Sequence, residues 1–233
     1  MEQLRGFPDR LMKVFFPSRS RAFSLIELMV VLGVVGLLLA FAAPNLFSLI
    51  SSNTLSAEGS LLRNQLTYAQ QIAVSKNADV EVRFFKVPDY ANAGIEEAFR
   101  SFQLYQYNLD GDLVPVSSYF RIKAPVAVHE NLSTLLNPGA NESSKDKKFG
   151  FSSPTMGSGE APVGEGGRME NAAYVSFRFR PDGSTDLPFR TSGSDTWYIT
   201  LVQGEGALNA DKPDNYLCLQ INPYNGQVSE FRP

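Results

Sequence analysis

The sequence predicts an α+β protein in which one long N-terminal helix precedes an antiparallel β-sheet. Three observations support this prediction. Leu28 to Ala43 is an uninterrupted apolar run, long enough for several helical turns. Apolar residues then recur at three- and four-residue spacing as far as Lys76. From Asn77 onward the pattern changes to the two-residue alternation that is typical of strands.

The N-terminal segment has the organisation of a basic leader followed by a membrane helix. Residues 1–22 hold five basic residues against two acidic ones, and basic residues that flank an apolar segment stay cytoplasmic. The segment 23–43 would be about 31 Å long as a helix, enough to cross a hydrocarbon core. The apolar core of a signal peptide is shorter, roughly 7 to 15 residues. We therefore expect one membrane span with the rest of the chain on the far side.

Glu27 is the residue that makes this helix unusual. An ionised carboxylate at membrane depth is costly, so it is rarely present without a partner. The segment 23–43 contains no Lys, Arg or His. The partner must come from another chain, from a new N-terminus of the same chain, or from lipid headgroups.

The stretch Ala22-Phe23-Ser24-Leu25-Ile26-Glu27-Leu28 resembles the processing site of type IV prepilins and type II secretion pseudopilins. The resemblance implies that a prepilin peptidase cleaves between Ala22 and Phe23 and that the new Phe23 amine is methylated. The residue before the cut is usually Gly in that family, and here it is Ala22. Pro44 stands where the family has a helix-kinking proline.

After such cleavage, Glu27 would lie four residues from the Phe23 ammonium, on the same helix face. It could pair with that amine in its own chain or in a neighbouring subunit, and methylation would keep the positive charge. The resemblance implies that this contact sets subunit register, which makes Glu27 and Pro44 the expected assembly residues. The alternative is that Glu27 reaches the headgroups and has no such role.

Beyond the apolar run, the sequence from Asn45 to Lys76 is amphipathic. The membrane helix is therefore expected to continue as one spine over residues 23–76, about 80 Å long. Pro44 should bend it, and Gly59 is expected to be a weak point that costs roughly 1 kcal/mol relative to Ala.

Residues 77–233 are expected to form a β-rich ectodomain. Gly, Ser, Asn and Glu dominate residues 137–171, which predicts a long mobile surface loop. Turns are predicted at 108–112, 181–183 and 224–226. The expected strands are 79–85, 101–107, 119–123, 172–180, 196–203, 216–221 and 227–231.

The resemblance extends past the N-terminus. Residues 61–77, leading into 80–84, are similar to the helix-to-strand passage of H-type minor pseudopilins and FimT-like minor pilins. Residues 179–183 and 226–228 resemble the same group, and the order of segments resembles the prepilin-like set called Verru_Chthon cassette protein D. This favours a minor subunit.

Composition and residue counts exclude several other functions. Without residues 1–22 the chain carries 16 Lys and Arg against 22 Asp and Glu, so nucleic-acid binding is not expected. Cys218 is the single cysteine and His129 the single histidine, which excludes an intrachain disulfide and a histidine cluster. Asn108, Asp110 and Asp112 have the spacing of a calcium loop, but Tyr119 occupies its twelfth position. We expect no enzyme activity, cofactor or metal, although calcium stays an open alternative at that loop.

The sequence therefore predicts a prepilin-like structural subunit of the bacterial inner membrane. Its expected partners are a prepilin peptidase, other pilin or pseudopilin subunits and the membrane itself. Two alternatives stay open. A signal peptidase could cut after Ala40-Phe-Ala42 and release a soluble protein that begins at Ala43. The ectodomain could also be a DNA receptor for uptake, although its C-terminal tail holds only Arg232 as a cation.

Overall fold

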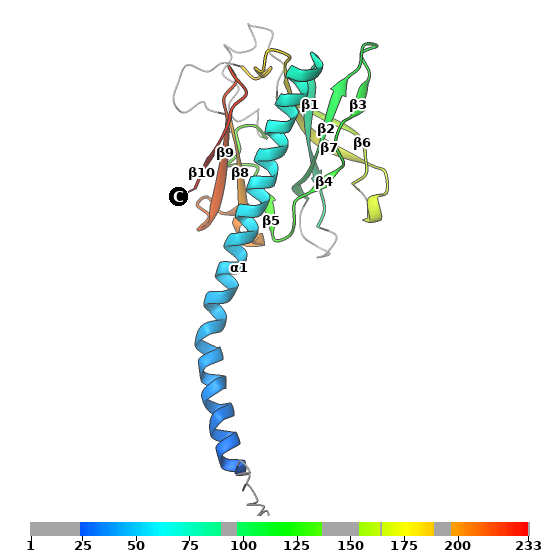
Figure 1. Ribbon diagram of the computed structural model, residues 1–233. Helices are drawn as coiled ribbons and strands as arrows, with labels where there is room; N and C mark the ends of the chain where they lie inside the picture. Colours follow the sequence, from blue (N-terminus) through cyan, green and yellow to red (C-terminus); the bar gives the residue numbers. More distant parts are fainter. Residues whose placement is uncertain (1–23, 90–96, 137–153, 164, 189–196, 233) are drawn as a thin grey trace, which may run out of the picture. The chain divides into compact units, whose positions relative to one another are not determined.

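The computed structural model describes residues 24–89, 97–136, 154–163, 165–188 and 197–232, with the side chains of 41–52, 165, 205 and 209 outside the described set. The chain divides into two units, Met1–Leu46 and Phe47–Pro233. One long helix is followed by an antiparallel sheet (Figure 1). The predicted α+β class is therefore confirmed.

The helix α1 extends over Leu25–Lys76. It ends because Asn77 adopts a left-handed conformation with φ 49°, which Asn tolerates better than most residues. The Ala78 N–H then donates to the Ala73 carbonyl oxygen at 3.2 Å, as in a Schellman motif. The predicted end of the helix is confirmed, whereas its predicted first residue, Phe23, lies outside the described residues.

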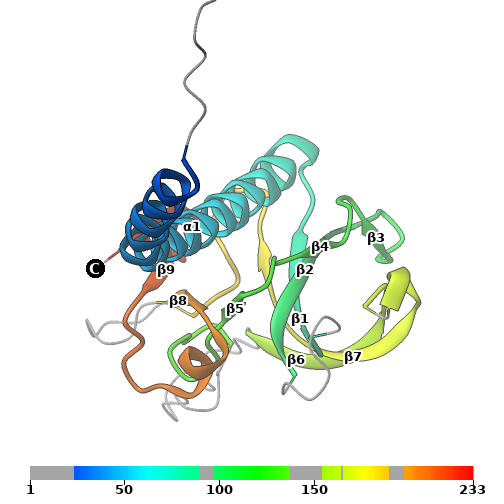
Figure 2. The ribbon, with the colours of Figure 1, turned by 90° about the horizontal axis from the view of Figure 1, so that it is seen from below.

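In the second unit, one face of α1 supplies the centre of the core. Its buried residues recur every three or four positions, and this part of the helix lies along one face of the sheet (Figures 1 and 2). Each buried leucine contributes roughly 1.5–3 kcal/mol to folding. The helix is thus fixed to the sheet mainly by apolar contact through Leu55, Leu62, Leu66, Ala69 and Ala73.

Gly59 of α1 lies against Leu217 of strand β9 (Tyr216–Ile221). A Cβ at this position would be 2.6 Å from Leu217 Cδ1, closer than atoms of real side chains approach. Gly59 therefore permits close helix–sheet packing. The sequence suggested only a weak point in the helix and did not reveal this requirement.

The described strands form one sheet in the order β10-β9-β8-β5-β2-β1-β7-β6, and every pairing is antiparallel. Two short strands, β3 and β4, pair with β2 beside this path. The remaining bounds are β1 Val80–Val87, β2 Ala98–Tyr107, β3 Leu113–Pro115, β4 Phe120–Arg121, β5 Val126–Val128, β6 Thr155–Ala161, β7 Glu170–Phe179, β8 Trp197–Gln203 and β10 Val228–Phe231, with short 3-10 helices at Glu165–Gly167 and Glu205–Asn209.

The alternation along β1 separates two faces of the sheet. Val82 and Phe84 belong to the main core with α1. Glu81 and Arg83 point to the opposite face, as strand geometry requires. That opposite face carries a second, smaller cluster built around Phe85 and Val87. The sheet is therefore occupied on both sides, by apolar residues toward α1 and by mixed polar and aromatic residues away from it.

Gln70 joins α1 to two distant turns. Its Nε2 donates to the Gly183 carbonyl oxygen at 2.9 Å and to the Asn225 carbonyl oxygen. Gly183 and Gly226 both have positive φ, 84° and 64°. A Cβ on Gly226 would overlap the Gly183 carbonyl oxygen. The three segments that carry the second sequence resemblance, within 61–77, 179–183 and 226–228, thus meet at one corner of the ectodomain.

Each predicted strand overlaps a described one, although 119–123 shrinks to Phe120–Arg121. The short strands β3 and β5 were not predicted. The predicted loop over 137–171 is wrong for residues 155–161, which form β6, while residues 137–153 lie outside the described residues. Apart from exposed Met156, strand β6 has no large apolar residue, and among the described strands it is an edge strand that pairs with β7. The Tyr174 ring packs against Gly157, where a Cβ would be 2.7 Å from it. A small residue is therefore required where the composition indicated a loop.

Replacing Gly226 with Ala should destabilise the ectodomain by about 2 kcal/mol or more, because the left-handed conformation is strained for Ala and the new Cβ meets the Gly183 carbonyl. Urea unfolding of the full chain in detergent, followed by the fluorescence of the single tryptophan, Trp197, measures this change. Gly206→Ala is the matched control, since no atom lies near its Cβ position. Equal stability of the two variants would contradict the packing at this corner.

Candidate functional site

The start of α1 carries a hydrogen-bonded cap. Ser24 directly precedes the helix, and the Glu27 N–H donates to the Ser24 Oγ at 3.2 Å. The Leu28 N–H donates to the Ser24 carbonyl oxygen at 3.2 Å. Ser24 is therefore the N-cap, and Glu27 is the third helical residue, where a carboxylate interacts favourably with the helix dipole. The spacing of Ser24 and Glu27 is that of a capping box.

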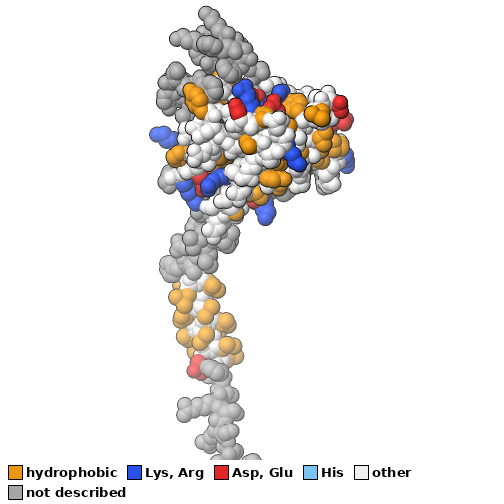
Figure 3. All heavy atoms as spheres, turned by 45° about the horizontal axis from the view of Figure 1, so that its top comes forward, with side chains coloured by type: hydrophobic (Ala, Val, Ile, Leu, Met, Phe, Trp, Pro, Cys, Tyr) orange, Lys and Arg blue, Asp and Glu red, His pale blue; other side chains and the backbone are white. Residues whose placement is uncertain are grey.

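Large apolar side chains are exposed along the first turns of α1, and Figure 3 shows those on the face turned to the viewer. Their exposed fractions run from 44% for Val35 to 77% for Leu25. Glu27 is the only ionisable residue between positions 25 and 40. Within the described part of the first unit, this helix thus presents an apolar surface interrupted by one carboxylate. The exposed residues are Leu25, Ile26, Leu28, Met29, Val30, Val31, Leu32, Val34, Val35, Leu37, Leu38 and Leu39.

The other residues predicted for processing and assembly are only partly described. Ala22 and Phe23 lie outside the described residues, and Pro44 lies within α1 but its side chain is not described. Within the described residues, no helix is both long enough and apolar enough to cross a membrane. The predicted span 23–43 includes Phe23 and the side chains of 41–43, which are not among those residues.

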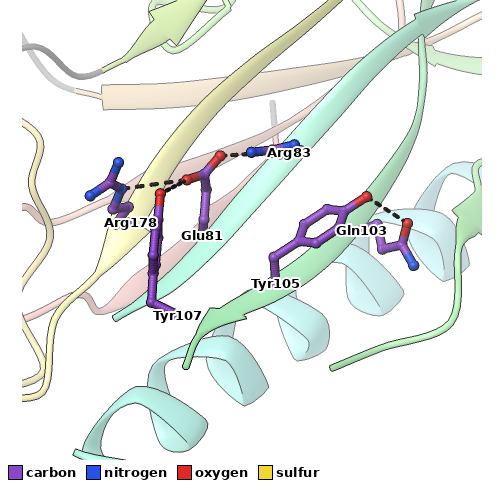
Figure 4. A network of polar contacts seen from close by, with 6 residues as sticks. All are labelled: Glu81, Arg83, Gln103, Tyr105, Tyr107 and Arg178. Atoms are coloured by element: carbon purple, nitrogen blue, oxygen red, sulfur yellow. Dashed lines mark hydrogen bonds and ion pairs between the residues drawn. The ribbon is translucent and has the colours of Figure 1, made fainter. Parts of the chain in front are cut away.

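On the sheet face away from α1, an ion network surrounds Glu81, which is 3% exposed (Figure 4). Arg83 Nε donates to Glu81 Oε1 at 2.7 Å. The Tyr107 hydroxyl donates to Oε2 at 2.6 Å, and Arg178 Nε lies 3.4 Å from the same oxygen. Three neighbouring strands, β1, β2 and β7, therefore converge on a single carboxylate.

Aromatic rings enclose the cations of this network. The Arg83 guanidinium lies 4.8 Å from the centre of the Tyr105 ring and 4.4 Å from that of Tyr174. Arg178 lies 4.5 Å from the Tyr107 ring. Such cation–π contacts each contribute about 0.5–2 kcal/mol. The Tyr105 hydroxyl donates to Gln103 Oε1 at 2.8 Å, which extends the same layer along β2 (Figure 4).

The electrostatics of the network keep Glu81 ionised. Burial raises the pKa of the Glu81 carboxyl, but the hydrogen bonds from Tyr107 and Arg83 and the charges of Arg83 and Arg178 outweigh it. The net pKa lies below its ordinary value. Burial and the bond to Glu81 raise the pKa of Tyr107 to about 12, and burial raises that of Tyr105. Both Glu81 oxygens are occupied by donors, so this network ties strands together and leaves no free carboxylate for proton transfer.

His129 lies directly after β5 and makes two structural hydrogen bonds. Its Nδ1 accepts from the Leu132 N–H at 3.1 Å, and its Nε2 lies 3.1 Å from the Ala210 carbonyl oxygen. The neutral ring that donates through Nε2 satisfies both contacts. His129 thus fastens the segment after β5 to the segment that follows the 3-10 helix Glu205–Asn209.

The turn at 108–112 uses its polar groups internally. Asn108 Oδ1 accepts from the backbone N–H groups of Asp110 and Asp112, at 3.0 and 2.7 Å. The oxygen that a calcium ion would need therefore already closes the turn. Within the described part of the chain, no group of three or more His, Cys, Asp or Glu side chains is placed to hold a metal ion.

Cys218 is partly buried in the sheet, and Arg232 is held by hydrogen bonds to other parts of the chain. Cys218 is half-buried in β9, and burial raises the pKa of its thiol. Arg232 donates to the Ser56 hydroxyl at 2.6 Å and to Asn215 Oδ1 at 3.2 Å. The C-terminal cation considered for DNA binding is therefore engaged by α1 and by the residue just before β9.

Sequence reasoning missed Ser24, Gln70 and the Glu81 network. The Ser-x-x-Glu spacing could have revealed Ser24, since it is a recognised helix-start pattern. No local pattern could have revealed the others. Gln70 bonds to residues 113 and 155 positions away, and Glu81 bonds to partners on two other strands.

Comparison with known proteins identifies one sequence motif, at the N-terminus. Residues 17–43 match the prokaryotic N-terminal methylation motif. Among solved structures, the minor pseudopilin EpsH of the Vibrio cholerae type 2 secretion system is 9% identical, with a TM-score of 0.38 over 77% of this chain and 97% of that one. The Pseudomonas aeruginosa (strain PAO1) type IV minor pilin FimU is 12% identical, with a TM-score of 0.36 over the same shares. No curated protein sequence is significantly similar to this chain.

Residues 17–43 thus carry the N-terminal methylation motif, and they include the capped apolar start of the helix that precedes the antiparallel sheet. The resemblance drawn from residues 22–28 is confirmed by this motif, which spans those residues.

Replacing Glu81 with Gln should lower ectodomain stability by about 2 kcal/mol at neutral pH, because Arg83 then loses its charged partner. Since the folded-state pKa of Glu81 is lowered, its contribution is present above the ordinary glutamate pKa and disappears as pH falls through the lowered value. The stability difference should therefore shrink on acidification. Urea unfolding at several pH values measures it, with exposed Glu160→Gln as control. A difference that does not change with pH would contradict the ion network.

Proposed function

We propose that this chain is a minor structural subunit of a type IV pilus-like filament or a type II secretion pseudopilus, and not an enzyme. A prepilin peptidase would cleave between Ala22 and Phe23 and methylate the Phe23 amine. The observation that carries the proposal is the start of α1. An apolar helix surface begins immediately after the predicted cut, and Glu27 is its only charge as far as residue 40.

Before assembly, the apolar part of α1 would anchor the subunit in the inner membrane, with residues 1–22 cytoplasmic and the ectodomain on the far side. Lipid is as apolar as a bundle of such helices, so apolar burial alone gives little preference for the bundle. A pair between Glu27 and a Phe23 ammonium supplies that preference. It also fixes register, because the pair forms only when neighbouring helices are correctly aligned.

Assignment as a minor subunit is supported by the corner around Gln70. The three segments that resemble H-type minor pseudopilins and FimT-like minor pilins are connected there by hydrogen bonds. Their common role is to hold the end of α1 against the turns after β7 and β9. We propose either a pilus or a secretion pseudopilus as the assembly machine.

Replacing Glu27 with Gln should leave membrane insertion unchanged and lower incorporation into filaments about thirtyfold, because a lost charge pair at membrane depth corresponds to roughly 2 kcal/mol. The measurement is the ratio of subunit in sheared filaments to subunit in membranes, in cells with an active assembly machine.

Asp211→Asn removes an exposed ectodomain carboxylate and is the matched control for that experiment. It should incorporate normally. Normal incorporation of Glu27→Gln would refute the pairing role and favour the alternative in which Glu27 only reaches the headgroups.

Replacing Ala22 with Leu should block processing, because the peptidase requires a small residue before the cut, whereas Ala22→Gly should be processed at least as well as the natural chain. Intact-mass measurement of the membrane-extracted protein distinguishes the forms, since an uncut chain keeps residues 1–22. Release of a soluble chain beginning at Ala43 from any of these proteins would overturn the proposal and support secretion.

A further inference from the structure

A pocket of about 300 Å³ lies at the end of β1, beside the segment that joins β4 to β5. Among the described residues, its wall includes Arg100, Arg121 and Lys123 together with one carboxylate, Asp89. The pocket thus carries an excess of positive charge, although the chain as a whole is acidic. Local charge of the opposite sign to the protein favours an anionic occupant.

Arg100 reaches this pocket because of a β-bulge. Phe85 pairs with Ser101 and Lys86 pairs with Phe99, so Arg100 has no opposite residue in β1. An extra residue of this kind changes the direction of its side chain, and bulges are enriched beside functional sites. The bulge places a guanidinium where regular alternation would not.

The Arg100 side chain is buried and only partly satisfied. The residue is 5% exposed, and its Nη1 donates to Asp89 Oδ2 at 3.4 Å. Its Nε and Nη2 are both buried and have no hydrogen-bond partner within the described part of the chain. A buried charged donor without a partner carries a desolvation penalty, and such groups in native structures call for an explanation.

We propose that this pocket binds a carboxylate group, held by the Nε and Nη2 edge of Arg100. These two N–H groups point the same way on one side of the planar guanidinium, which matches the two oxygens of a carboxylate. Asp89 accepts a hydrogen bond from Arg100 Nη1, so within the described residues the Nε and Nη2 atoms stay available to a ligand. Arg121, whose Nη2 donates to the Pro88 carbonyl oxygen at 3.3 Å, and exposed Lys123 add positive charge at the rim.

A carboxylate fits this geometry better than a phosphate. One guanidinium edge offers two donors in a plane, and the Asp89 carboxylate would repel a dianion more strongly than a monoanion. The site is independent of the N-terminal motif, so it exists whether or not the chain assembles into filaments.

The test uses the full chain in detergent, labelled with ¹⁵N-arginine, and titrates it with sodium acetate against sodium chloride of equal ionic strength. We expect the Arg100 Nε–H resonance to shift saturably with acetate and not with chloride. The unfolding temperature should rise with the same concentration dependence, because a ligand that binds only the folded state stabilises it.

Two variants make the result specific. Arg100→Lys keeps the charge and loses the two-donor edge, so its unfolding temperature should respond to acetate and chloride alike. Arg168→Gln removes an exposed guanidinium outside the pocket and should leave the acetate response unchanged. Equal effects of acetate and chloride on the natural chain, a saturable acetate response in Arg100→Lys, or tighter binding of inorganic phosphate would each overturn the proposal.

The carboxylate could be a free small molecule or an acidic side chain of a second copy of this chain. Sedimentation of the natural chain with and without acetate separates these sources. Acetate that reduces self-association, with no such effect in Arg100→Lys, identifies a neighbouring copy as the donor. Saturable acetate binding without any change in self-association identifies a free carboxylate.

Discussion

The apolar surface at the start of α1 is the constraint on which the rest of this protein depends. Twelve large apolar side chains lie exposed between Leu25 and Leu39. Removing them from water is worth roughly 20 kcal/mol, more than the net stability of most domains. Such a surface must be covered by lipid or by other helices. Because Glu27 is the one charge within it, the covering partner must also accommodate a carboxylate.

The same helix meets a different requirement in its second half. There its buried apolar residues lie on one face and are covered by the sheet. Gly59 permits the close approach to Leu217, and Gln70 holds the helix to two turns. The opposite face of the sheet is tied together by the Glu81 network. The second half of α1 is therefore held to the sheet by apolar packing and by hydrogen bonds.

The sequence predicted those parts of the structure that depend on local pattern. The end of α1 at Lys76 follows from the change of periodicity at Asn77, and β1 follows from strict alternation. Strand β6 could not be predicted in this way, because it is stabilised by pairing with β7 and its glycines accommodate a ring from that strand. The Glu81 network depends on how β1, β2 and β7 are aligned with one another. The sequence of a single strand does not determine that alignment. Glu27 was identified because it is a carboxylate within an apolar segment. Ser24, which caps the start of α1, was not identified.

The most direct test is mass spectrometry of the N-terminal peptide of the protein purified from membranes of cells that contain a prepilin peptidase. We expect a peptide that begins at Phe23 and carries one additional methyl group on its amine. A chain that retains residues 1–22 and still polymerises would contradict it, because no Phe23 ammonium would then exist to pair with Glu27.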